Sequence, residues 1–200
     1  MTPLAVTDLL AYNFNLNTTD FISRLDSPPP FSLVRQSFMH DLAREGDLLS
    51  AEVIFDAGNG ADLPDDIGRR PLHEAAFFGH LDMVRFFLDH GAVLDAPIHP
   101  FGHTALYLAV QQSRYDVAQY LIKRGAKPGV EDKLLGTGLL HIAAAKGDMR
   151  MAGILIAAGA NIFHEDKKGM TARDTAARHG HNSLAKALLK TMEHHAKYLV

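Results

Sequence analysis

Histidine is the side chain whose number and spacing most readily suggest chemistry in this sequence, because 12 of the 200 residues are histidines. A neutral imidazole is a common metal ligand. His99 and His103 lie in one short segment, and His194 and His195 are adjacent. Neither pair has carboxylate or cysteine companions at the spacing of zinc sites. We therefore expect no metal and no other cofactor. The alternative hypothesis is a protein that binds a small molecule or responds to a metal through His99 and His103.

Motifs of catalysis are not found in the sequence. It contains no Gly-Lys-Ser/Thr phosphate-binding loop, no Gly-x-Ser-x-Gly elbow and no His-Glu-x-x-His pair. Asp65 and Asp66 form a carboxylate pair, but they lie where a solvated loop is expected, and charge is ordinary there. The lack of any cysteine excludes disulfides, thiol catalysis and cysteine-ligated zinc. We expect a protein that is not an enzyme.

The residues around His73 belong to a pattern that recurs along the chain. A glycine lies five residues before four of the recurring positions, and a glycine, or Ser113 in one copy, lies six residues after each. Glycine adopts positive φ angles readily and marks turns and helix ends. The pattern predicts a short helix, a tight turn, a second helix and a connecting loop in each copy. Positions equivalent to His73 hold His40, Tyr107, His141 and Asp174, at intervals of 33 or 34 residues.

The predicted second helix of each copy carries apolar residues at i, i+3, i+6 and i+7, which is one face of a helix. The predicted first helix carries small residues such as Ala75, Ala76 and Ala109. Small side chains let neighbouring helices approach closely when repeats stack. The apolar positions of three copies are Leu81, Val84, Phe87 and Leu88, then Tyr115, Ala118, Leu121 and Ile122, then Met149, Ala152, Leu155 and Ile156.

The repeat resembles the ankyrin repeat, whose signature is Thr-Pro-Leu-His-x-Ala at a period of about 33 residues. The resemblance covers residues 33 to 192 and implies an all-α solenoid of about five helix-turn-helix repeats joined by finger loops. We place the repeats at about 33–65, 66–99, 100–133, 134–166 and 167–200. The signature positions read Arg70-Pro71-Leu72-His73-Glu74-Ala75, Thr104-Ala105-Leu106-Tyr107-Leu108-Ala109, Gly138-Leu139-Leu140-His141-Ile142-Ala143 and Thr171-Ala172-Arg173-Asp174-Thr175-Ala176.

Residues 1–32 form an N-terminal extension outside the repeats and are rich in Leu, Phe and Ile. We expect this segment to cap the exposed end of the stack, because terminal repeats need cover to stay soluble. An arm that binds a partner is the other interpretation. Residues 1–10 do not resemble a secretory signal, and no stretch approaches the roughly 20 apolar residues that cross a bilayer.

The net charge of −3 argues against a general nucleic-acid-binding protein, which normally has a basic face. We therefore expect a cytoplasmic protein that binds neither nucleic acids nor membranes. The resemblance also accounts for five of the histidines. It implies that His40, His73 and His141 hydrogen-bond the backbone of the adjacent finger, and that His80 and His181, which follow turn glycines, are structural.

In ankyrin repeats the usual partner surface is a concave groove, lined by the finger tips and by variable positions of the inner helices. In the second repeat these helix positions hold Phe77 and Phe78, although stacking requires no apolar residue there. Exposed apolar patches usually mark interaction sites, and aromatic anchors often carry much of an interface's energy. The alternative is that one of the two phenylalanines packs into a neighbouring helix. The finger tips add Ile67, Phe101, Leu134 and Leu135.

Polar residues complete the predicted partner surface, and charge is predicted to divide along it. Such a division sets orientation and association rate more than affinity. The polar candidates are Arg69, His103, Gln111, Gln112, Lys146 and Lys168. The predicted acidic end holds Glu45, Asp65, Asp66 and Glu74, and the predicted basic end holds Arg124, Lys146, Lys167, Lys168 and Arg178.

These features predict a non-enzymatic protein–protein interaction module, a monomer that binds another protein in its groove. The mechanism would be steric, through capture, scaffolding or blocking of a partner's active surface. An inhibitor, an immunity-type protein or a scaffold fits this description. A self-associating structural unit, with the apolar patch buried between two copies, is a further alternative.

Overall fold

A computed structural model of the chain describes residues 31–56 and 60–197, with side chains described from Phe38 onward. Within these residues ten α-helices follow one another in five pairs, which confirms the predicted all-α solenoid. The first, or inner, helices are α3 (Phe31–Glu45), α5 (Pro71–Phe78), α7 (Ala105–Gln111), α9 (Leu139–Lys146) and α11 (Ala172–Arg178). The second, or outer, helices are α4 (Leu48–Asp56), α6 (Leu81–Asp89), α8 (Tyr115–Lys123), α10 (Met149–Ala157) and α12 (Asn182–Ala196).

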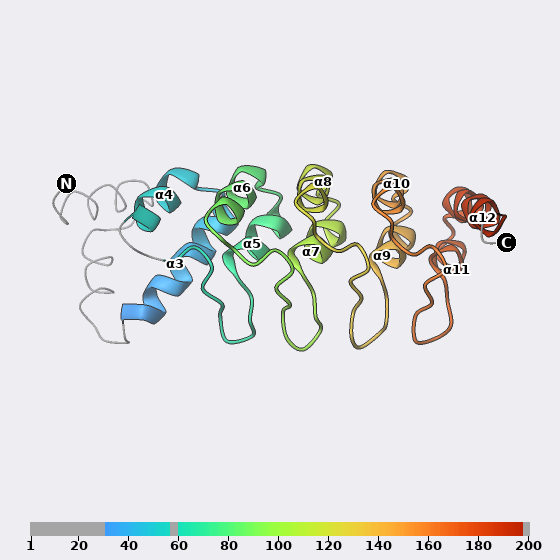
Figure 1. The fold of residues 1–200 in the computed structure, drawn as a ribbon. Helices are drawn as coiled ribbons and strands as arrows, with labels where there is room; N and C mark the ends of the chain where they lie inside the picture. The colour runs from blue at the N-terminus through green and yellow to red at the C-terminus, as the bar shows by residue number, and fades with distance from the viewer. Residues whose placement is uncertain (1–30, 57–59, 198–200) are drawn as a thin grey trace.

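The helix pairs stand in a row along the chain, with the outer helices α6, α8, α10 and α12 along one edge (Figure 1). The finger loops, which join one pair to the next, project from the opposite side. Residues 1–30 of the predicted cap, which spans residues 1–32, lie outside the described residues, and its last two residues begin α3 at Phe31. No helix in the described part of the chain has both the length and the apolar character needed to cross a membrane.

One hydrophobic core runs through all the repeats, from Met39 in α3 to Leu188 in α12. Each repeat therefore buries its apolar face against its neighbours, as stacking requires. Met149 departs from the predicted pattern, because it lies at the start of α10 and is 48% exposed. Neighbouring inner helices approach closely because the residues between them are small: Ala75, Ala76, Ala109, Ala143, Ala144 and Ala176 are all buried.

In the first four repeats, a side chain from the following repeat holds the end of the inner helix, where the chain turns to the outer helix. In the fourth pair the Ala145 carbonyl oxygen accepts a hydrogen bond from His181 Nε2 over 3.1 Å. The last carbonyls of a helix have no partner within the helix, so this bond satisfies one of them and ties two repeats together. The structural role implied for His80 and His181 is confirmed. The equivalent donors and acceptors in the earlier pairs are His80 with Arg44, Arg114 with Phe77, and Lys146 with Gln111.

The glycine at this turn is required both by its backbone and by the side chain packed against it. Gly147 has a φ of +68°, in the left-handed region that favours glycine. A Cβ atom at this position would lie 2.5 Å from His181 Nδ1. The equivalent turn of the third pair holds Ser113 at a φ of 54°, the one positive φ of a non-glycine residue in the described part of the chain.

Three buried histidines connect the inner helices to the fingers. His73 Nε2 lies 2.9 Å from the Ala96 carbonyl oxygen, His40 Nε2 lies 2.9 Å from that of Arg69, and His141 Nε2 lies 2.8 Å from that of Met170. A carbonyl oxygen only accepts, so Nε2 carries the proton in each case. The backbone role implied for these three histidines is confirmed.

A repeated backbone hydrogen bond joins neighbouring fingers near their tips. The amide of His99 donates to the Ile67 carbonyl oxygen at 2.9 Å, and Lys133 and Lys167 donate to Phe101 and Leu135 at 2.9 and 3.0 Å. Each acceptor directly precedes a tip glycine with positive φ. Ile67, Phe101 and Leu135 therefore occupy the same place in three successive fingers. Lys168, which precedes Gly169, occupies that place in the fourth.

Candidate protein-binding surface

The finger tips and the ends of the inner helices carry the residues that we call the groove face. Five apolar side chains on it are exposed: Ile67 by 50%, Phe78 by 37%, Phe101 by 37%, Leu134 by 57% and Leu135 by 56%. None of the five belongs to the hydrophobic core. The groove face comprises Ile67, Arg69, Phe101, His103, Leu134, Leu135 and Lys168 from the fingers, and Phe77, Phe78, Gln111, Gln112, Lys146 and Arg178 from the helix ends.

The two adjacent phenylalanines of α5 have different surroundings. Phe78 is 37% exposed, whereas Phe77 is half-buried and packs against the core. Their rings meet edge to face, with 5.1 Å between the centroids. Phe77 therefore supports the ring of Phe78, and Phe78 is the side chain of the two that a partner can reach.

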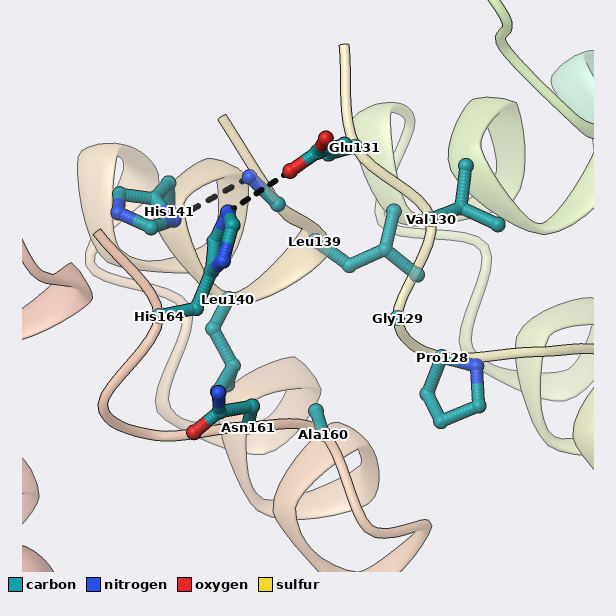
Figure 2. Close-up of a pocket in the computed structure, with 11 residues that line it drawn as sticks. Pro128, Gly129, Val130, Glu131, Leu139, Leu140, His141, Ala160, Asn161 and His164 are labelled. Carbon is teal, nitrogen blue, oxygen red and sulfur yellow. Dashed lines mark hydrogen bonds and ion pairs between the residues drawn. The ribbon is translucent and has the colours of Figure 1, made fainter. Parts of the chain in front are cut away.

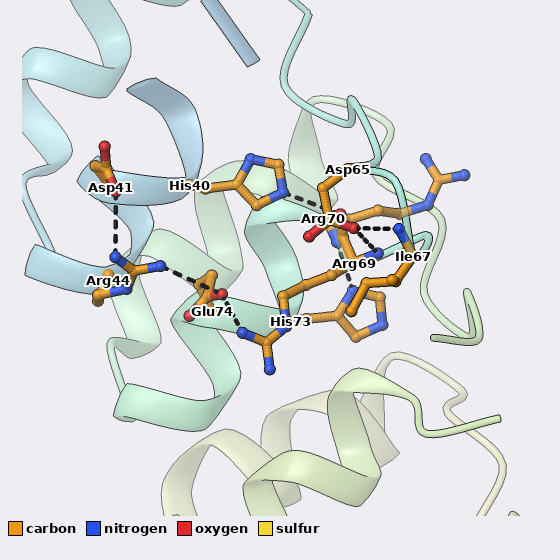
Figure 3. Close-up of polar contacts among 9 residues, drawn as sticks. All are labelled: His40, Asp41, Arg44, Asp65, Ile67, Arg69, Arg70, His73 and Glu74. Atoms are coloured by element: carbon orange, nitrogen blue, oxygen red, sulfur yellow. Dashed lines mark hydrogen bonds and ion pairs between the residues drawn. The ribbon is translucent and has the colours of Figure 1, made fainter. Parts of the chain in front are cut away.

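Arg69 is bound to an acidic residue inside the protein, as Figure 3 shows. Its Nη1 lies 2.7 Å from Glu74 Oε1, and Arg44 Nη2 lies 3.7 Å from the same oxygen. The Glu74 side chain is only 4% exposed, and a buried carboxylate needs such partners. The prediction that Glu74 adds to an acidic end of the groove is wrong, because its charge is buried and paired. Asp65 is also engaged, since its Oδ1 accepts the amides of Ile67 and Arg69 at 3.0 and 2.7 Å.

His103 joins the second finger to the third. Its Nε2 lies 2.7 Å from Asp132 Oδ2, and its ring stacks on Tyr107, with 3.8 Å between the centroids. Burial alone would raise the pKa of Asp132, but the amide of Leu135 and the imidazole of His103 bring it below its ordinary value. Contact of His103 with a partner stays a prediction. Across residues 31–56 and 60–197, no three His, Asp or Glu side chains gather as a possible metal-binding group.

Gln111 and Gln112 lie at the end of α7, where Gln111 is exposed and Gln112 is half-buried. Lys146 Nζ donates to the Gln111 carbonyl oxygen and to Ser113 Oγ, the latter over 3.2 Å. The ammonium group of Lys146 therefore fastens the fourth repeat to the third. An ammonium has three N–H donors, so a third donor is left for a partner.

A hollow of about 350 Å³ opens between the last two inner helices and the fingers. It brings together three of the predicted partner residues, Gln111, Lys146 and Lys168. The remaining lining residues are Thr137, His141, Ile142, Ala145, Asp166, Met170, Thr175, Arg178 and His179. Helix-end and finger side chains thus share one hollow at the C-terminal half of the groove face.

Arg124 lies away from the groove face. It follows the outer helix α8, where its Nη1 donates to Asp89 Oδ1 at 2.8 Å and to the Tyr120 hydroxyl at 2.6 Å. The prediction that Arg124 adds to the basic end of the groove is wrong, because its position belongs to the outer layer and its charge is paired with Asp89.

A second hollow, of about 310 Å³, is lined by α9 and by the loops that follow α8 and α10 (Figure 2). His164 Nε2 lies 3.2 Å from Glu131 Oε2 and 2.8 Å from the Gly136 carbonyl oxygen. The His164 ring meets the His141 ring edge to face at 5.5 Å. None of the predicted partner residues lines this hollow.

Sequence reasoning missed the residues that shape the fingers and the floor of the larger hollow. Asp132 accepts the amides of Leu134 and Leu135, each at 2.8 Å, and so orders the third finger. The available signal was the recurrence of an aspartate near the start of the finger tip, at Asp65, Asp132 and Asp166. Met170 and Ile142 gave no comparable signal, because an apolar residue in a repeat predicts core.

Comparison with known sequences identifies the family. Residues 39–132 and 124–198 match the family described as ankyrin repeats (3 copies). The chain therefore belongs to the ankyrin-repeat family, whose repeats are protein–protein interaction modules and are generally not catalytic.

Three relatives illustrate the match. The probable 26S proteasome regulatory subunit p28 of Saccharomyces cerevisiae is 34% identical over 131 residues, which are 64% of this chain and 57% of that protein. A transient receptor potential cation channel subfamily A member 1 homolog of Caenorhabditis elegans is 33% identical over 129 residues, 64% of this chain and 10% of the channel. The nuclear factor NF-kappa-B p105 subunit of Mus musculus is 31% identical over 133 residues, 65% of this chain and 14% of that protein. The chain thus spans less than two thirds of each of these relatives.

Proposed function

We propose that this protein binds another protein through its groove face and acts sterically, without catalysis. The observation that carries the proposal is the set of five exposed apolar side chains on that face, Ile67, Phe78, Phe101, Leu134 and Leu135. They come from three successive fingers and from α5. Burying them against a partner would gain about 25 cal/mol for each Å² of apolar surface removed from water.

The framework behind the groove face favours binding without rearrangement. The hydrogen bonds between fingers fix the backbone at Ile67, Phe101 and Leu135. The Phe77 ring, packed against the core, supports the ring of Phe78. A surface that is already ordered loses less conformational entropy when it binds.

The proposal extends to the role and the setting of the protein. The yeast relative is named as a probable regulatory subunit, which supports a role in which this chain captures or blocks a partner, as an inhibitor or scaffold does. We propose a cytoplasmic monomer. Contacts of the partner with Arg69, His103 and Gln112 remain part of the proposal.

Affinity capture from native lysate tests this function. The groove variant is Phe78→Ser with Leu135→Ser. The matched control is Leu49→Ser with Leu189→Ser, because these leucines are 73% and 39% exposed on the outer helices α4 and α12. We expect proteins retained by the wild type and by the control to be lost from the groove variant, with circular dichroism showing equal helicity in all three. Equal retention by the groove variant would refute binding through this face.

A further inference from the structure

Three cationic side chains of the larger hollow have no carboxylate partner. Lys146, Lys168 and Arg178 make no ion pair in the described part of the chain. Six arginines elsewhere, Arg44, Arg69, Arg70, Arg85, Arg124 and Arg173, each lie against a carboxylate, whereas no lysine in the described part of the chain makes an ion pair. The hollow therefore gathers cations that the protein itself does not neutralise.

The carboxylate that lines the hollow is already engaged by the backbone of its finger. Asp166 Oδ1 accepts the amide hydrogens of Lys168 at 2.8 Å and Met170 at 2.9 Å. The Met170 amide is the main cause that keeps the pKa of Asp166 below its ordinary value. Asp166 is one carboxylate against three cations, so the hollow keeps an excess of positive charge.

The guanidinium of Arg178 has only a weak contact within the protein. Its Nη1 reaches the Met170 sulfur at 3.5 Å, and a thioether is a poor acceptor. Ile142, Ala145 and Met170 provide apolar surface beside it. The volume of about 350 Å³ is near the lower end for ligand pockets, about 300–1,000 Å³, and suits one or two side chains rather than a large ligand.

From this arrangement we infer that the hollow receives an acidic side chain, aspartate or glutamate, of the bound partner protein. The inference rests on the proposed function and names the chemistry of the partner. A carboxylate in the hollow would accept charge-assisted hydrogen bonds from Lys168 and Arg178, and guanidinium groups commonly bind carboxylates through two parallel bonds.

The finger tips support the same order of contacts along the groove face. The position before the tip glycine holds Ile67, Phe101 and Leu135 in three fingers, and Lys168 in the fourth. A partner segment that follows the fingers would therefore meet apolar side chains first and positive charge at the C-terminal end. The partner we infer presents apolar residues followed, in the direction of the C-terminal repeat, by an acidic residue.

A random peptide library displayed on phage and selected on the full chain tests the inference. The test variant is Lys168→Gln with Arg178→Gln, whose side chains are exposed. The matched control is Lys186→Gln with Lys190→Gln, which removes the same charge from exposed positions on α12. Affinities of selected synthetic peptides for each protein are measured by fluorescence anisotropy.

We expect the selected peptides to be enriched in Asp and Glu over the unselected library. Each exposed ion pair typically changes an affinity by a few-fold, so loss of both cations should weaken peptide binding by about tenfold. The control variant should bind the peptides as the wild type does. The inference would be overturned if the selected peptides showed no acidic enrichment and bound the test variant as tightly as the wild type. If the same peptides lost affinity for Phe78→Ser with Leu135→Ser, the proposed function would still stand. If no peptide were selected, or if no selected peptide depended on Lys168 and Arg178 or on Phe78 and Leu135, the inference and the proposed function would both fail. A dimer that the test variant abolishes would show a second copy of the chain as the occupant, and would also overturn the inference.

Discussion

Mild acid is expected to destabilise this protein through His73. The imidazole is 1% exposed, and both of its nitrogens are used: Nδ1 accepts the amide hydrogen of Arg70 at 2.9 Å, and Nε2 donates to the Ala96 carbonyl oxygen at 2.9 Å. A second proton, on Nδ1, would point at the Arg70 amide hydrogen and break that bond. The pKa of His73 is lowered from 6.5 to about 4: burial is the largest cause, the charges of Arg69 and Arg70 act in the same direction, and the bond to the Ala96 carbonyl oxygen opposes them.

The direction of the effect follows from the two pKa values. Because the folded-state pKa lies below the unfolded-state value, the unfolded chain binds the proton first as the pH falls. The stabilisation is fully present above pH 6.5 and is lost as the pH falls from 6.5 through about 4. At 1.36 kcal/mol for each pKa unit, the free energy of unfolding falls by about 2 kcal/mol between pH 7 and pH 5 and by about 3 kcal/mol at pH 4.

Urea denaturation of the wild type and of His73→Gln, followed by circular dichroism, measures this loss. Glutamine has an N–H donor but does not titrate. We expect the wild type to lose about 2 kcal/mol more than the variant between pH 7 and pH 5. Between pH 8 and pH 7 the two proteins should change in parallel, which serves as the control. Parallel loss down to pH 5 would refute the argument that the buried imidazole is held neutral.

Three further comparisons between variants test structural roles. Gly147→Ala is expected to destabilise the protein by about 1 kcal/mol more than Gly159→Ala in thermal denaturation. Both glycines have positive φ, but only at Gly147 would the new Cβ displace His181 from its hydrogen bond. Equal losses of stability in the two variants would contradict this. Arg69→Met is expected to lower stability by about 2 kcal/mol, since it leaves the buried Glu74 with Arg44 alone, and adding Glu74→Gln should recover most of the loss. No recovery would argue against the ion pair as the cause. Phe77→Ala should lower the free energy of unfolding measured in urea by about 2 kcal/mol, and Phe78→Ala by less than about 0.5 kcal/mol, because only Phe77 packs against the core. Similar losses in the two variants would refute that difference in burial.

Much of the fold could be predicted because the repeat fixes the register of each element. The recurring glycines located the turns, and the signature position located His40, His73 and His141, whose bonds to the fingers the structure confirms. Less could be predicted where different residue types serve the same purpose. His80, Arg114 and His181 directly follow the turn residue and hold the end of the inner helix of the preceding repeat, but Lys146 does the same from a different position, before its turn glycine.

The candidate site was predicted in outline, and its errors have a physical origin. Exposure at a helix end depends on contacts between repeats, so adjacent residues such as Phe77 and Phe78 could not be told apart. The charge of Glu74 was predicted to be exposed, because its pairing with Arg69 and Arg44 arises only when the inner helices and a finger meet.

Site-specific photo-crosslinking tests the binding of a partner through the groove face most directly. A benzophenone amino acid replaces Phe101, which is 37% exposed at a finger tip, or replaces Leu49, which is 73% exposed on the outer helix α4, as the control. After capture from native lysate and irradiation, mass spectrometry identifies the crosslinked proteins. Binding through the groove face predicts a partner crosslinked from position 101 and not from position 49. A captured partner that crosslinks from position 49 but never from position 101 would contradict it.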